Sequence, residues 1–147
     1  MPPVPLVIHE RIGTWARQLR PRVAAWPVRV VETRSGPELA SALVDRPWPL
    51  AVVDLADRAE SALRELAEGL ADLPEALILV LDPESLPGAA GLARELGATQ
   101  VVSGFAPPPM VLDLLARWLP LAEGRAAVAG WVAEPPLRAE PWESPTL

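Results

Sequence analysis

Asp54 is the residue of this sequence best placed to do chemistry. It directly follows the run Leu50-Ala51-Val52-Val53, and this apolar, partly β-branched run predicts a buried parallel strand. Sites in open α/β sheets lie beyond the carboxyl ends of the strands. The position of Asp54 therefore predicts either a site or a strand-end acid that accepts N–H hydrogen bonds from the following turn.

The composition excludes several other kinds of chemistry. The sequence has no cysteine and a single histidine, so disulfides and thiol catalysis are excluded and a structural zinc site is not expected. No glycine-rich phosphate loop follows any predicted strand, and no nucleophile is paired with a base. We therefore do not expect a small-molecule enzyme.

Charge and hydropathy narrow the choice of partners. The net charge is −6, and the thirteen basic residues, all of them Arg, form no cluster. A nucleic-acid partner is not expected, because phosphate contacts depend on clustered cations. The apolar runs are far shorter than the ~20 residues of a membrane span, and the residues after Met1 do not resemble a signal peptide. We expect a cytoplasmic protein without a membrane partner.

Strand-like and helical patterns alternate along most of the chain. The predicted strands cover residues 5–9, 28–32, 50–55, 76–81 and 99–103, and the predicted helices cover 12–19, 35–44, 59–70, 87–96 and 110–118. This alternation indicates an α/β fold with a doubly wound, five-stranded parallel sheet. Pro120 should end the last helix. We therefore expect a domain at 1–120 and a Pro-rich tail at 121–147, in which residues 126–131 can add a helical turn.

Three stretches of the sequence resemble one known family. They are residues 28–40, the run from Leu50 to Leu55 with Asp54, and Gly97-Ala98 leading into the last predicted strand. Together with the order and length of the predicted elements over about the first 120 residues, they resemble the receiver domain of two-component response regulators. The resemblance implies a flavodoxin-like (CheY-like) sheet with strand order 2-1-3-4-5.

The resemblance also implies a role for each strand-end residue. Asp54 matches the aspartate that takes up a phosphoryl group, and His9 and Glu10 stand where the family has two acids that help to hold Mg²⁺. Asp82 stands where the family has a Ser or Thr hydroxyl. Ser103 and Gly104 stand where it has a Lys followed by Pro, and this chain contains no Lys at all.

These departures predict a dismantled phosphorylation pocket. A carboxylate at Asp82 would repel an aspartyl phosphate, and the missing Lys removes a charge-assisted hydrogen bond. The resemblance thus implies a pseudo-receiver: a non-catalytic protein-interaction module that needs neither phosphate nor a cofactor, and whose partner is another protein or its own copy. The alternative is an atypical working receiver, in which Glu10 and Asp54 hold Mg²⁺ and Ser103 partly replaces the missing contacts.

The tail leaves a further alternative open. Trp131 and Trp142 are large aromatic residues in a segment rich in Pro and Glu, and such residues can anchor a docking peptide. Either residue can bind a partner, and Trp131 can equally fold back onto the domain. If the tail is the main binding element, the protein is an adaptor or a subunit of a complex.

Overall fold

The computed structural model describes residues 2–45, 48–72 and 74–133. Five strands alternate with five helices along it. The strands are β1 (Val4–His9), β2 (Val28–Thr33), β3 (Leu50–Asp54), β4 (Leu77–Asp82) and β5 (Gln100–Ser103), and the helices are α1 (Thr14–Leu19), α2 (Gly36–Val44), α3 (Ala59–Gly69), α4 (Ala89–Leu96) and α5 (Pro108–Ala133). Each strand agrees with the sequence prediction to within one residue at either end.

The strands form one parallel sheet in the order β2-β1-β3-β4-β5. This is the flavodoxin-like order that the resemblance implies, so the predicted fold class is confirmed. Because all strands run the same way, their carboxyl ends meet at one edge of the sheet. His9, Asp54, Asp82 and Ser103 each end a strand at this edge.

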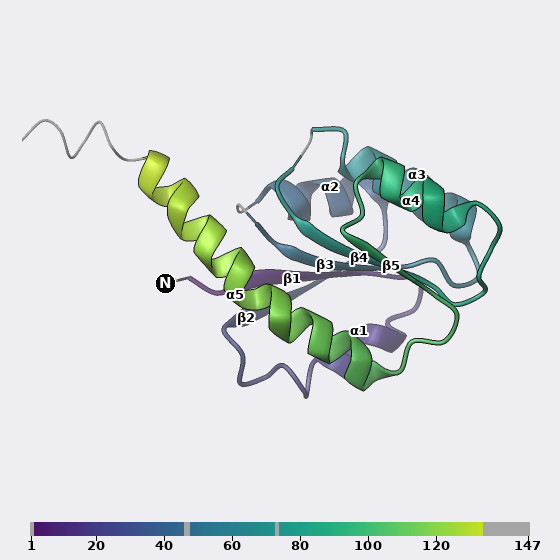
Figure 1. The fold of residues 1–147 in the computed structure, drawn as a ribbon, viewed down its shortest axis with the longest axis horizontal. Coiled ribbons are helices and arrows are strands. Elements are labelled where there is room, and N and C mark those ends of the chain that lie inside the picture. Colours follow the sequence, from purple (N-terminus) through teal and green to yellow (C-terminus); the bar gives the residue numbers. More distant parts are fainter. Residues whose placement is uncertain (1, 46–47, 73, 134–147) are drawn as a thin grey trace, which may run out of the picture.

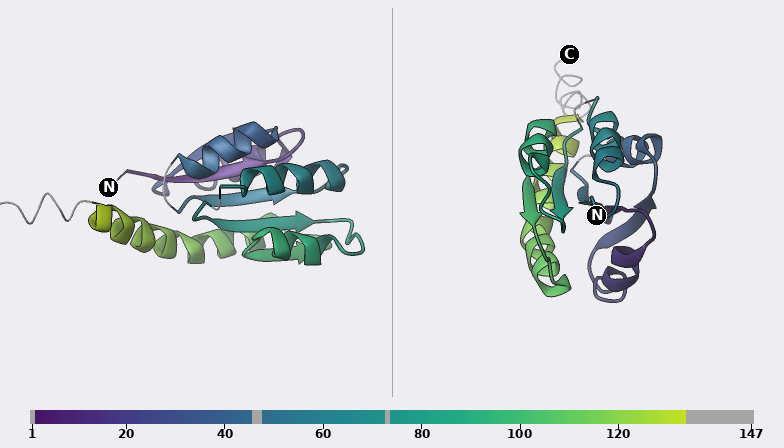
Figure 2. Two further views of the ribbon diagram at one scale, coloured as in Figure 1. Left: turned by 90° about the horizontal axis from the view of Figure 1, so that it is seen from above. Right: turned by 90° about the vertical axis from the view of Figure 1, so that its right-hand side faces the viewer.

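Helices cover both faces of the sheet (Figures 1 and 2). Successive side chains of a strand point to opposite faces, and the core is divided accordingly. Leu6, Val52 and Leu79 pack with residues of α1 and α5 on one face. Val7 and Val53 pack with residues of α2, α3 and α4 on the other. This alternation decides which strand-end side chains can meet.

Local signals set several helix ends. Ser35 caps α2 in a capping box with Glu38, as its spacing predicts. The helix α4 begins at Ala89 rather than at the predicted Pro87, because Gly88 has a positive φ of 80° that is not helical. Ile12 and Val44 are apolar but exposed, because both lie at helix ends, Ile12 before α1 and Val44 on the last turn of α2.

The predicted end of the last helix at Pro120 is wrong. The helix α5 runs through Pro120 to Ala133, and it stands clear of the sheet over its second half (Figures 1 and 2). A proline inside a helix removes a hydrogen bond, but Leu119 and Ala122 on either side of it are buried in the core, and this packing offsets the loss. The expected boundary between residues 120 and 121 therefore falls inside a helix.

The length of α5 changes the placement of one predicted site residue, Trp131. Trp131 lies on the last turns of α5 rather than in a tail, while its side chain and the whole of Trp142 lie outside the described residues. None of the described helices is long and apolar enough to cross a membrane.

Candidate functional site

Asp54 lines a small cavity at the carboxyl edge of the sheet. The cavity has a volume of about 220 Å³ and lies between β3, β4, α1 and the β5–α5 turn, with Thr14, Trp15, Gln18, Asp54, Leu81, Pro83, Gly104, Phe105, Ala106 and Pro108 around it. Most of these side chains are apolar, and Phe105 is 84% exposed at the mouth. Apart from Asp54 itself, no charged side chain lines this cavity among the residues that the structure describes.

Leu81, and not Asp82, is the β4 residue beside Asp54. The two strands pair with Asp54 opposite Leu81, so these two side chains share the face of α1 and α5. Asp82 is one residue further and therefore points to the other face. Its carboxylate accepts hydrogen bonds from the Leu86 N–H at 3.1 and 3.3 Å and closes the β4–α4 turn. The expected repulsion between Asp82 and a phosphoryl group at Asp54 thus has no geometric basis.

Glu10 is on the face of Asp54, but its carboxylate already has partners. Its two oxygens accept the backbone N–H groups of Trp15 and Ala16, both at 2.8 Å, and Glu10 is buried. These N–H groups belong to the first turn of α1, where they have no partner within the helix. Glu10 therefore caps the N-terminus of α1.

The residues expected to hold Mg²⁺ do not fit that ion well. Mg²⁺ takes several oxygen ligands in octahedral geometry, whereas both Glu10 oxygens are engaged and one oxygen of Asp54 accepts the Ala56 N–H at 3.2 Å. The described part of the chain gathers no group of three or more His, Cys, Asp or Glu side chains able to bind a metal.

Ser103 and His9 also lie apart from Asp54. Ser103 pairs with Asp82 at the end of β5, and the cavity is lined by the following residues Gly104 and Phe105 instead. His9 pairs with Val53 in β3, and its side chain therefore points to the face of α2 and α3. Of the strand-end residues expected to form one acidic pocket, the structure brings only Glu10 and Gly104 to the face of Asp54.

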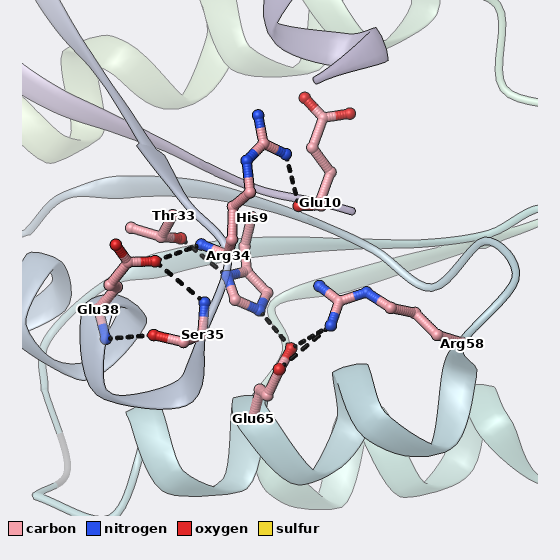
Figure 3. Close-up of polar contacts among 8 residues, drawn as sticks. All are labelled: His9, Glu10, Thr33, Arg34, Ser35, Glu38, Arg58 and Glu65. Carbon is pink, nitrogen blue, oxygen red and sulfur yellow. Dashed lines mark hydrogen bonds and ion pairs between the residues drawn. The ribbon is translucent and has the colours of Figure 1, made fainter. Parts of the chain in front are cut away.

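His9 is the centre of a separate polar network (Figure 3). Its ring is fully buried, with Nδ1 2.8 Å from the Thr33 hydroxyl and Nε2 2.8 Å from a carboxylate oxygen of Glu65. A carboxylate can only accept, so Nε2 carries the proton and donates, and Nδ1 accepts from the Thr33 hydroxyl. Burial, the largest cause, lowers the pKa of His9 below its ordinary value of 6.5 despite the nearby Glu65. The imidazole is therefore neutral at pH 7.

Arg58 completes this network. Its Nη1 donates to both carboxylate oxygens of Glu65, at 2.9 and 3.1 Å, and the two side chains are only 17% and 18% exposed. The Nε and Nη2 atoms of Arg58 are buried without a hydrogen-bond partner among the described residues. Arg58 follows Asp54 by four residues and is the least of the influences on the pKa of Asp54, whereas its guanidinium is paired with Glu65 on α3.

Among the comparisons with known proteins, only the comparison with solved structures found matches. No family model and no curated protein matches the chain. A signal receiver domain of a LuxO repressor protein from Vibrio parahaemolyticus matches with a TM-score of 0.68 at 14% identity, over 86% of this chain and 97% of that one. A CheY-like receiver domain protein from Methanospirillum hungatei matches with a TM-score of 0.68 at 11% identity, over 83% and 98%. The chain has the receiver fold.

A third match shows what this fold can carry elsewhere. A response regulator from Burkholderia pseudomallei, solved with a phosphorylated aspartic acid, a calcium ion and citrate, matches with a TM-score of 0.62 at 19% identity, over 86% of this chain and 74% of that one. The TM-scores establish the receiver fold of this chain. At identities this low, its chemistry has to be judged from its own residues.

Sequence reasoning missed the partners of His9. The pattern of α3 puts Arg58 and Glu65 opposite its apolar face, whereas in the structure both side chains are largely buried and Glu65 contacts His9 of β1. Their spacing of seven residues, two helical turns, puts them on one helix face. That spacing, together with a histidine at the end of a buried strand, is the signal that could have indicated a polar contact beneath α3.

Asp54→Asn is expected to stabilise the receiver fold at pH 7. Burial raises the pKa of Asp54, with Glu10 and Asp57 as lesser causes, against the Ala56 N–H and Arg58. A raised folded-state pKa favours folding below the unfolded value, and this contribution is lost as the pH rises through the folded value. The amide avoids the burial of a charge, so we expect a gain of roughly 0.5–1 kcal/mol. Urea unfolding at pH 7 and pH 4 checks this, because the gain should shrink at pH 4. A loss of stability at pH 7 would contradict it.

Proposed function

We propose that the chain is a pseudo-receiver, a non-catalytic module that binds a protein partner or its own copy without phosphorylation of Asp54. The receiver fold supports a role in signalling. The surroundings of Asp54 support independence from phosphate, because no cationic side chain lines its cavity among the described residues, the nearby Arg58 is paired with Glu65, and few carboxylate oxygens are free.

The observation that carries this proposal is the apolar cavity at Asp54. A phosphoryl group needs cations or N–H and O–H donors around its oxygens. The described lining of the cavity supplies no cation; its neutral donors are on Thr14, Trp15 and Gln18, and its other side chains, such as Leu81, Phe105 and Ala106, are apolar. The cavity has a volume of about 220 Å³, and most of its lining side chains cannot neutralise the negative charge of a phosphoryl group. Asp54 itself is pushed toward its neutral form, because burial raises its pKa. A doubly charged aspartyl phosphate would be poorly stabilised at this position.

The binding face of this proposal is formed by α4, β5 and α5. The strand β5 is at the edge of the sheet, α4 packs beside it, and Phe105 and Met110 are exposed where β5 passes into α5. Exposed aromatic and Met side chains are typical of protein interfaces. The same turn forms the mouth of the Asp54 cavity, so a partner bound there would cover Asp54.

The proposal predicts that phosphoryl analogues leave the protein unchanged. We expect no change in the amide chemical shifts around Asp54 when Mg²⁺ with beryllofluoride is added at millimolar concentration, and no phosphorylated species in intact mass spectra after incubation with acetyl phosphate. Asp57→Asn is the matched control, because Asp57 is an exposed acid in the same loop. Shift changes that persist in Asp57→Asn and vanish in Asp54→Asn would show a working receiver and overturn the proposal.

A further inference from the structure

A second cavity lies at the amino-terminal ends of the strands, opposite the carboxyl ends where Asp54 lies. It is a groove of about 670 Å³ between α5 and the residues that precede β3 and β4, and its walls include Trp48, Glu75, Leu121, Arg125 and Val128. The guanidinium of Arg125 lies 4.6 Å from the centre of the Trp48 ring, an arrangement that fixes the indole by a cation–π contact. The groove thus has an ordered aromatic wall.

The α5 side of this groove is apolar and exposed. Leu121 is 49% exposed and Val128 is 62% exposed, and their spacing of seven residues puts them on one helix face, two turns apart. Between them Gly124 has no side chain, and a Cβ placed there would meet nothing within 4 Å. The groove therefore continues along the helix toward Ala129, which is its last lining residue.

We propose that residues 134–147 of the same chain occupy this groove. The helix α5 ends at Ala133, four residues after Ala129, so the following segment starts at the open end of the groove. Residues 134–147 span up to about 45 Å when extended, whereas the helix from Pro120 to Ala133 is about 20 Å long. The segment can therefore turn back and cover the whole groove.

The chemistry of the segment matches the groove. It contains Pro135, Pro136, Leu137, Pro141, Trp142 and Pro145. Proline restricts the chain before binding, and Pro-rich segments dock on grooves with aromatic walls. Covalent attachment adds an effective concentration in the millimolar range for a short linker, which favours this segment over a second molecule.

This inference is independent of the proposed function, because the groove is remote from Asp54. It assigns Trp142 and its neighbours to a contact within the chain, so that the segment is a ligand of its own domain rather than the anchor for a partner.

A single spin label tests the proposal on the full chain. The sequence has no cysteine, so Thr146→Cys gives one attachment point for a nitroxide. We expect the label to broaden the amide signals of Leu121, Arg125 and Val128 while leaving those of α3 and α4 sharp. Uniform broadening, or none along α5, would overturn the proposal.

Two controls identify the occupant. Val128→Glu should abolish the selective broadening, whereas Leu92→Glu, an exposed leucine on α4, should leave it unchanged; equal effects of the two variants would contradict the proposal. A mixture of spin-labelled protein without ¹⁵N and ¹⁵N protein without the label distinguishes contacts within one molecule from contacts between two molecules. Broadening of α5 in that mixture would show that the segment of a second copy fills the groove, and it would overturn occupation within the chain.

Discussion

Glu65→Ala is expected to destabilise the protein by about 3 kcal/mol, because it breaks a buried ion pair from one side. Glu65 is the partner of both His9 Nε2 and Arg58 Nη1. Without it, the His9 N–H loses its acceptor and Arg58, which already has two buried unpaired nitrogens, keeps a charge with no counter-ion. Thermal or urea unfolding followed by circular dichroism measures the loss.

The helix offers a matched control for this prediction. Glu60 on α3 also pairs with an arginine, Arg64, at 3.1 Å, but the two side chains are 90% and 64% exposed. Exposed pairs of this kind contribute about 0.3–0.5 kcal/mol, so Glu60→Ala should change the stability by less than about 0.5 kcal/mol. Equal effects of the two substitutions would mean that the network around His9 does not stabilise the fold.

The second large effect is a loss of stability in mild acid that depends on His9. The folded-state pKa of His9 is lowered, chiefly by burial, so the unfolded chain binds the proton more readily. Stability is then retained above pH 6.5 and falls below it, by at most about 1.4 kcal/mol per pH unit. The fall ends once the pH drops below the folded-state pKa.

Comparison with His9→Gln isolates this effect from the carboxylates. The variant is expected to be less stable at pH 7, because Gln cannot span Thr33 and Glu65, but its stability curve between pH 7 and pH 5 should lack the histidine slope. The charged groups that act on His9 are Glu65, Arg58 and Glu38, and all are retained in both proteins. Parallel curves for the two proteins would show that His9 does not titrate differently in the folded state.

The sheet could be predicted from the sequence because its strands carry an unambiguous pattern. Runs such as Leu50 to Val53 and Leu77 to Leu81 are apolar throughout, as buried parallel strands require, and the intervening helices carry capping signals such as Ser35. The end of α5 could not be predicted in the same way. Local sequence favours a break at Pro120, whereas the burial of Ala122, which decides the outcome, depends on the packing of the whole domain.

The candidate site was predictable only in part, and the reason is geometric. Sequence identified Asp54, and the structure confirms its hydrogen bond to the following turn. The position of Asp82 could not be judged from its sequence, because a shift of one residue along a strand exchanges one face of the sheet for the other. Whether Leu81 or Asp82 lies beside Asp54 depends on strand register, which the sequence of one strand does not specify.

The length of α5 has a mechanical consequence. A helix of 26 residues is about 39 Å long; its first half packs on the sheet, and the start of its second half is held by the burial of Ala122 and the contact of Arg125 with Trp48. Beyond Arg125 about 12 Å of helix remains, so a tilt of about 10° at that point would move the end of the helix by about 2 Å. Small adjustments of packing under Leu119 and Ala122 would therefore be passed on to the end of the helix at Ala133.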